Sequence, residues 1–130
     1  MSLLSLSGVS KRYGEVRALD RATLSVAAGT LTAIVGASGS GKTTLLRLIA
    51  GFEMPDEGSI VFDELQVAGP LRMVPPHRRG IGLVAQEGAL FPHLSVGGNI
   101  GFGMERRSDR AEIDALLRAV ELDPAIRKRM

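Results

Sequence analysis

The chain has 130 residues, 45% of them hydrophobic, which predicts a single domain with a modest core. Its 16 Lys and Arg residues nearly balance 14 Asp and Glu residues for a net charge of +2, and the basic residues are dispersed, so we expect no nucleic-acid partner. The lack of cysteine excludes disulfides and thiolate metal sites. No signal-peptide pattern and no run of about 18 apolar residues occurs, which predicts a cytoplasmic chain.

The N-terminal region predicts two strands, because apolar and small polar residues alternate over residues 3–9 and again over 22–26. A turn is expected at Tyr13 and Gly14. Tyr13 is the only tyrosine, and an exposed ring beside a turn could stack on a nucleotide base. An ordinary loop or edge-strand tyrosine is the alternative interpretation.

Residues 36–43 read Gly-Ala-Ser-Gly-Ser-Gly-Lys-Thr and match the phosphate-binding pattern G-x-x-x-x-G-K-[ST] in full. The flanking residues agree with this pattern, which lies between a strand and a helix, because residues 31–35 predict a buried strand and residues 44–50 predict a helix. Backbone N–H groups of such a loop bind phosphate, Lys42 reaches the β- and γ-phosphates, and the Thr43 hydroxyl binds Mg²⁺. The residues expected to bind nucleotide are Gly36, Ser38, Gly39, Ser40, Gly41, Lys42, Thr43 and Thr44.

Asp63 and Glu64 follow a predicted strand over residues 59–62. An acidic pair at the end of an apolar strand can hold Mg²⁺ and activate water in nucleotide hydrolases. Here only three apolar residues precede the pair, and residues 64–67 continue as a second strand. We therefore expect an exposed hairpin tip and not a metal site.

The loop over residues 71–80 contains a basic cluster, which we expect to form a solvated face: Arg72, His77, Arg78 and Arg79. Residues 81–85 are a short apolar run of the kind buried in a parallel sheet, and the run ends at Gln86. Polar side chains at the ends of such strands face the ligand crevice, so Gln86 could orient a water or contact Mg²⁺. A glutamine that only caps the loop is the alternative.

The segment after Gln86 places apolar residues and a proline in a loop over residues 87–95, which suggests a docking surface. His93 has no cluster of partner ligands nearby, so we do not expect a metal there. Ser95 is a candidate cap for a short helix that its glycines would weaken.

The C-terminal region predicts two helices. Ser108 and Asp109 are candidate caps for a helix over residues 110–120. Asp123 followed by Pro124 predicts the start of a last, short helix. The longer helix carries an apolar stripe that we expect to pack in the core: Ile113, Leu116, Leu117 and Val120.

Together these residues resemble the N-terminal half of the ATP-binding subunit of ABC transporters. The early run of predicted strands suggests an antiparallel β portion beside a nucleotide-binding α/β core. The resemblance implies that this α/β fold is an incomplete P-loop NTPase core of ABC ATPase type. It implies that residues 36–43 are the family's Walker A motif, that Tyr13 stacks on adenine, and that Gln86 is the Q-loop glutamine. Lys42 and Gln86 are then the expected catalytic residues, and Thr43 and Gln86 the expected Mg²⁺ ligands.

The activity implied by the resemblance is ATP hydrolysis coupled to solute import, with ATP and Mg²⁺ as cofactors. The implied partners are transmembrane permease subunits and a second ATP-binding subunit, at the inner face of the cell membrane. Residues 74–82 and 86–94 are similar to importers of ferric iron, polyamines and sulfate, and among these we favour ferric iron.

The family's Leu-Ser-Gly-Gly-Gln signature, second metal-binding strand, D-loop and switch histidine do not occur in the sequence. We therefore expect residues 1–130 to be the N-terminal part of an ATP-binding domain, inactive alone. A non-hydrolysing nucleotide-binding or regulatory module is the alternative. A GTPase is disfavoured, because no [NT]-K-x-D guanine-reading pattern occurs. Residues 31–35 and 81–85 are expected to have open strand edges.

Overall fold

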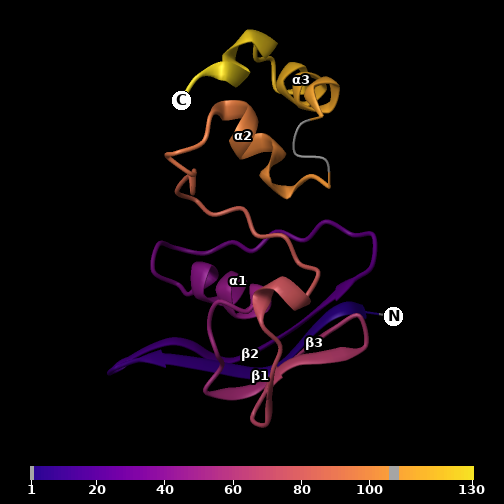
Figure 1. The fold of residues 1–130 in the computed structure, drawn as a ribbon. Coiled ribbons are helices and arrows are strands. Elements are labelled where there is room, and N and C mark those ends of the chain that lie inside the picture. The colour runs from indigo at the N-terminus through magenta and orange to yellow at the C-terminus, as the bar shows by residue number, and fades with distance from the viewer. Residues whose placement is uncertain (1, 106–108) are drawn as a thin grey trace. The chain divides into compact units, whose positions relative to one another are not determined.

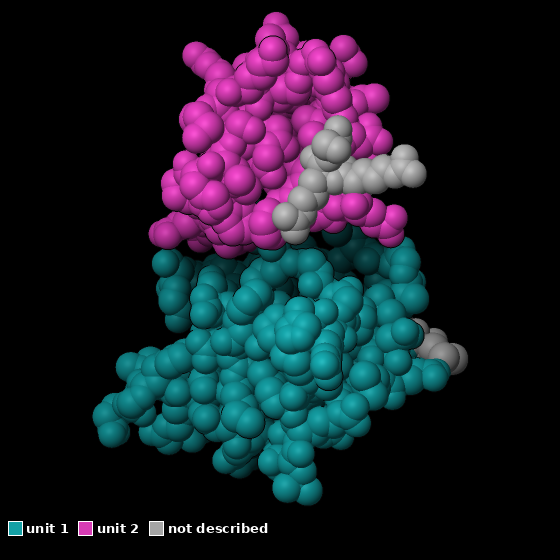
Figure 2. All heavy atoms as spheres, in the orientation of Figure 1, with its two compact units in different colours: residues 1–84 teal, residues 85–130 magenta. Residues whose placement is uncertain are grey.

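The computed structural model describes residues 2–105 and 109–130, which form two compact units (Figure 2). Unit 1 comprises residues 1–84 and unit 2 comprises residues 85–130. The phosphate-binding pattern belongs to unit 1, and Gln86 belongs to unit 2. Ser108, one of the two predicted helix caps, lies outside the described residues.

Unit 1 is built on a five-stranded sheet whose paired strands are all antiparallel, in the order β2-β1-β3-β4-β5 (Figure 1). The predicted antiparallel portion is therefore confirmed, and its first two strands are longer than the alternation indicated, because they pair along a hairpin up to Tyr13 and Val16. The strands are β1 (Ser2–Tyr13), β2 (Val16–Ala27), β3 (Glu57–Phe62), β4 (Leu65–Gly69) and β5 (Arg72–Met73).

Helix α1 (Lys42–Ala50) lies across one face of this sheet (Figure 1) and supplies three of the eight residues of the buried cluster. Leu48 is fully buried, which contributes roughly 1.5–3 kcal/mol by removing its side chain from water. The helix ends at Gly51, whose φ of 93° places it in the left-handed region, and the Gly51 N–H donates to the carbonyl of Arg47 at 3.0 Å. The buried cluster consists of Leu6, Val9, Leu45, Leu48, Ile49, Ile60, Val67 and Ala68.

Residues 31–35 and 81–85 do not form strands, so the prediction of two buried parallel strands is wrong in this structure. Leu31 and Val35 are almost completely exposed, and so is Val84. A strand exists only where a neighbour pairs with its N–H and C=O groups, and within the described residues the one sheet is antiparallel and includes neither segment. The P-loop core is thus incomplete, as the resemblance implied.

Arg79 is buried, which corrects the expectation that the basic cluster forms a solvated face. Arg72, His77 and Arg78 are exposed as predicted, but only 4% of Arg79 is accessible. Burial lowers the pKa of the Arg79 guanidinium below its ordinary value, because desolvation disfavours the charged form. The guanidinium donates to the carbonyl oxygens of Val74 (2.7 Å), Leu48 (2.9 Å), Ile49 (2.9 Å) and Val67 (3.1 Å), and to the Met73 sulfur (3.1 Å).

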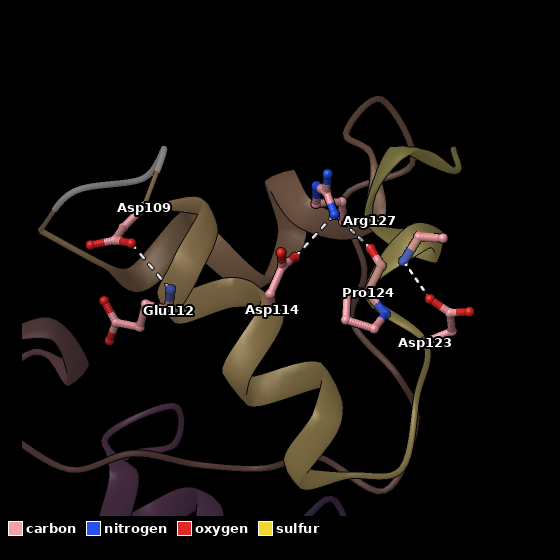
Figure 3. Close-up of polar contacts among 7 residues, drawn as sticks. Asp109, Glu112, Asp114, Asp123, Pro124 and Arg127 are labelled. Atoms are coloured by element: carbon pink, nitrogen blue, oxygen red, sulfur yellow. Dashed lines mark hydrogen bonds and ion pairs between the residues drawn. The ribbon is translucent and has the colours of Figure 1, made fainter.

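Unit 2 is helical, and three of its helical elements begin at predicted caps, of which Figure 3 shows Asp109 and Asp123. Ser95 accepts from Gly98 N–H at 3.1 Å, Asp109 from Glu112 N–H at 3.1 Å, and Asp123 from Ala125 N–H at 2.8 Å. The elements are α2 (Val96–Ile100), η2 (Gly101–Gly103), α3 (Arg110–Ala119) and η3 (Pro124–Lys128), of which η2 and η3 are 3₁₀ turns.

The apolar stripe of α3 is only half buried, so the expectation that all of it packs in the core is partly wrong. Ile113 and Leu117 are buried, whereas Leu116 and Val120 are exposed. An ion pair between Asp114 of α3 and Arg127 of η3, 3.1 Å long, holds the two elements together (Figure 3). Both side chains are largely shielded from water, which strengthens the pair relative to a surface one.

We expect Arg79→Met to lower the free energy of unfolding by roughly 2–4 kcal/mol. Each buried carbonyl left without a donor costs roughly 1–3 kcal/mol, and the apolar replacement recovers part of that cost by burial. Urea unfolding followed by circular dichroism measures the loss. The exposed neighbour Arg78→Met is the control and should change stability by less than about 0.5 kcal/mol. Equal losses in the two variants would show that the buried guanidinium is not a stabilising contact.

Candidate functional site

The loop over residues 36–41 leads directly into α1 and leaves the helix N-terminus without a side-chain cap. Gly41 occupies the cap position with φ 92°, and Gly39 has φ 78°, so two glycines turn the loop through backbone conformations that other residues rarely adopt. No acidic residue occurs in the first turn of α1. The positive end of the helix dipole therefore meets neither a capping oxygen nor a carboxylate, which suits an anionic ligand.

Lys42 lies at the centre of this loop. Its Nζ donates to the carbonyl oxygens of Gly36 at 2.6 Å and Ala37 at 2.7 Å, and to the Ser40 hydroxyl at 3.2 Å. The loop thus wraps around the Lys42 ammonium group. This positive charge lies close to the loop N–H groups that phosphate oxygens would approach. Thr43 follows on the first turn with its side chain exposed. The arrangement fits a nucleotide that is bound through its phosphates, with a metal ion on the Thr43 hydroxyl.

Gly41 also lies against β2. A Cβ at this position would collide with the carbonyl oxygen of Ala18 and approach Leu19 Cδ2 to 3.0 Å. The obstacle at Ala18 is backbone, which cannot rotate away. Residue 41 must therefore be glycine for two independent reasons, its φ and its closeness to β2.

Tyr13 lies on the same hairpin that supports the loop. It pairs with Val16, two residues before Ala18, and it is 44% exposed at the end of β1. The structure thus brings the hairpin of Tyr13 against Gly41, while the position also suits an ordinary strand-end tyrosine. Stacking of this ring on a base stays a prediction.

Asp63 and Glu64 form the tip of the β3–β4 hairpin, as predicted. Phe62 pairs with Leu65, both acidic residues are exposed, and their φ values are 48° and 64°. Two positive φ angles in a two-residue turn are the pattern of a tight hairpin. The pair is therefore not placed at the end of a buried strand, where it could serve a metal.

Gln86 lies at an exposed bend in unit 2, so its predicted contacts with Mg²⁺ and water stay predictions. The apolar loop that follows is held by Asn99, a residue that the sequence did not single out. The Asn99 side chain accepts from Phe91 N–H at 2.8 Å and donates to the carbonyls of Phe91 (3.1 Å), Leu94 (3.2 Å) and Ser95 (3.1 Å). One amide that satisfies four backbone groups fixes the shape of the loop.

A cavity of about 280 Å³ opens beside this loop, and most of its lining side chains are apolar. The centroids of the Phe91 and Phe102 rings lie 4.3 Å apart, so two aromatic side chains pack together at the loop. Docking of a partner at residues 87–95 stays a prediction. Within residues 2–105 and 109–130, no cluster of three or more His, Cys, Asp and Glu side chains is suited to a metal, and no helix is long and apolar enough to span a membrane.

We expect Gly41→Ala to destabilise unit 1 more than Gly29→Ala. Both glycines have positive φ, so each substitution carries the cost of about 1–2 kcal/mol for a Cβ in the left-handed region. Only position 41 adds a collision, because the space around Gly29 is open. Thermal and urea unfolding of the two variants would measure the difference, and equal losses would contradict the close approach of β2.

The chain is similar to known proteins over most of its length. The model of the ABC transporter family matches residues 19–130. The Fe(3+) ions import ATP-binding protein FbpC of Mesorhizobium japonicum is 61% identical over 99% of this chain, and that of Serratia marcescens is 54% identical over 95%. The chain spans 36% of the length of each of these two relatives.

Solved structures show the same fold. A dimeric ATP-binding cassette in a post-hydrolysis state, bound to ADP and Pi, has a TM-score of 0.79 and 28% identity over 97% of this chain and 60% of its own. A bacterial Atm1-family ABC exporter with ATP bound has a TM-score of 0.76 and 34% identity over 88% of this chain and 20% of its own. With a family model that covers most of its residues and an ABC-type ATPase fold, the chain belongs to the ABC transporter family.

Proposed function

We propose that this chain is part of the ATP-binding subunit of an importer and that the complete subunit couples ATP hydrolysis to the transport of ferric iron. The observation that carries the proposal is the glycine loop closed around Lys42 at the uncapped N-terminus of α1. The two relatives named above support ferric iron as the solute, because both are described as import ATP-binding proteins for Fe(3+) ions.

In the proposed binding mode, the N–H groups at the start of α1 hold the phosphates. Lys42 exchanges its bonds to the Gly36 and Ala37 carbonyls for bonds to the β- and γ-phosphate oxygens, without moving far from the loop centre. Thr43 would hold Mg²⁺, which supplies positive charge to the phosphates when bound, and Gln86 is the proposed second ligand. Tyr13 would stack on adenine from the hairpin that supports Gly41.

The proposed partners are permease subunits and a second ATP-binding subunit. The apolar cavity held by Asn99 is the surface that we assign to the permease, since an exposed apolar patch rimmed by polar groups marks a protein contact. Binding to a permease would place the complete subunit at the inner face of the cell membrane. The dimeric cassette with ADP and Pi supports pairing of two such domains.

A non-hydrolysing nucleotide-binding module remains the second candidate for residues 1–130 taken alone. The position of Asp63 and Glu64 favours it, because an exposed hairpin tip supplies no base to a nucleotide held by Lys42. Binding and hydrolysis are therefore tested separately.

We expect Lys42→Ala to abolish most ATP binding, because the loop amides alone do not neutralise a triphosphate. Calorimetry at fixed salt measures the affinity. Lys128→Ala removes an equal charge from an exposed position in unit 2 and should bind ATP like the wild type. Equal ATP affinity of Lys42→Ala and the wild type would contradict the proposed site.

We expect the 130-residue chain to release phosphate from ATP no faster than background, since its described residues place no carboxylate pair at a strand end beside the loop. Steady-state phosphate release, compared with that of Lys42→Ala, measures this rate. A turnover of about one per minute that depends on Lys42 would show that Asp63 and Glu64 act in catalysis after all.

A further inference from the structure

We propose that Lys11 is a positioning residue for the nucleotide base: its ammonium group holds one face of the Tyr13 ring and leaves the other face for adenine. The proposal rests on the proposed function, because it concerns the same nucleotide site. It assigns a role to a residue that neither touches phosphate nor belongs to the glycine loop.

Lys11 and Tyr13 are two residues apart on β1, so their side chains leave the strand on the same side. The Lys11 Nζ lies over the Tyr13 ring, 5.4 Å from its centroid, which is within the range of a cation–π contact. The Lys11 side chain is only 14% exposed, whereas Tyr13 is 44% exposed. The Lys11 side chain is thus largely shielded from solvent, whereas the accessible part of the Tyr13 ring is available to a ligand.

Two carboxylates keep the ammonium group in place. Lys11 Nζ lies 3.8 Å from Glu53 and 3.7 Å from Asp56. Asp56 is itself fixed, because it accepts from the backbone N–H of Arg12 at 2.7 Å and its own N–H donates to the carbonyl of Ser10 at 2.9 Å. A cation held between two carboxylates, one of them on a residue fixed by backbone hydrogen bonds, has little freedom to leave the ring.

The same carboxylates connect the ring to α1. Glu53 also pairs with Arg47 of α1 at 3.7 Å, so two cations and two anions form a chain of contacts from the Tyr13 ring to the phosphate-binding helix. Lys42 is held by separate contacts to the loop carbonyls. Loss of the Lys11 charge should therefore weaken binding of the base while binding of the phosphates is kept.

The experiment compares ATP with tripolyphosphate, which has the phosphates without the base, on the wild-type chain and on Lys11→Met. Calorimetry gives both affinities, and because Tyr13 is the only tyrosine and tryptophan is absent, intrinsic fluorescence reports on this ring alone. We expect Lys11→Met to raise the Kd for ATP about three- to tenfold, the range of a shielded cation–π contact, and to leave the Kd for tripolyphosphate within about twofold. Tyrosine quenching should shift to higher ATP concentration by the same factor.

Lys11→Arg keeps both the cation and its carboxylate partners and should restore ATP affinity, which a purely structural loss of packing would not explain. Lys128→Met is the charge control and should change neither affinity. Equal rises of the two Kd values in Lys11→Met, or an unchanged Kd for ATP, would overturn the role of Lys11. Failure of the wild-type chain to bind tripolyphosphate would instead overturn the proposed function itself.

Discussion

The buried guanidinium of Arg79 is the contact on which the arrangement of unit 1 depends. It donates to backbone carbonyls at the end of α1, in β4 and at Val74, and to the side-chain sulfur of Met73 in β5. No carboxylate pairs with Arg79 among the residues that the structure describes, so backbone carbonyls and the Met73 sulfur compensate the desolvated charge. Two of these carbonyls belong to the last turn of α1, where the helix dipole is negative and favours a cation.

Helix α1 is therefore held at both ends by contacts that require glycine. At its C-terminus, a Cβ on Gly51 would lie 2.6 Å from the Arg79 Nε, so glycine there both ends the helix and leaves space for the guanidinium. At its N-terminus, Gly41 packs against the backbone of Ala18. A helix fixed in this way presents Lys42 and its first N–H groups at a defined place on the sheet, and such preorganisation is what anion binding requires.

The charges around the proposed nucleotide site are separated into two groups. Lys42 is surrounded by neutral acceptors, which leave its positive charge uncompensated and available to phosphate. Lys11 and Arg47 are instead paired with Glu53 and Asp56, which keeps that group close to neutral beside the Tyr13 ring. Uncompensated positive charge is thus concentrated where the phosphates would bind, whereas binding of the base would rely on an aromatic face.

Local features of this protein were determined by the sequence. The glycine loop, the hairpin tip at Asp63 and Glu64, and the helix caps at Ser95, Asp109 and Asp123 all depend on residues within a few positions of one another, so a short pattern was enough to predict them. The antiparallel portion was predicted for the same reason, because alternation and turn residues mark a hairpin.

Contacts between distant segments were decided only by the tertiary structure. Arg79 looks like its exposed neighbours in sequence, and its burial depends on carbonyls up to 31 residues away. The approach of Ala18 to Gly41 and the amide contacts of Asn99 likewise left no recognisable pattern. Residues 31–35 have the composition of a buried strand, yet they stay exposed because no neighbouring strand pairs with them in the described chain. A strand is a property of its pairing partners, which composition alone does not supply.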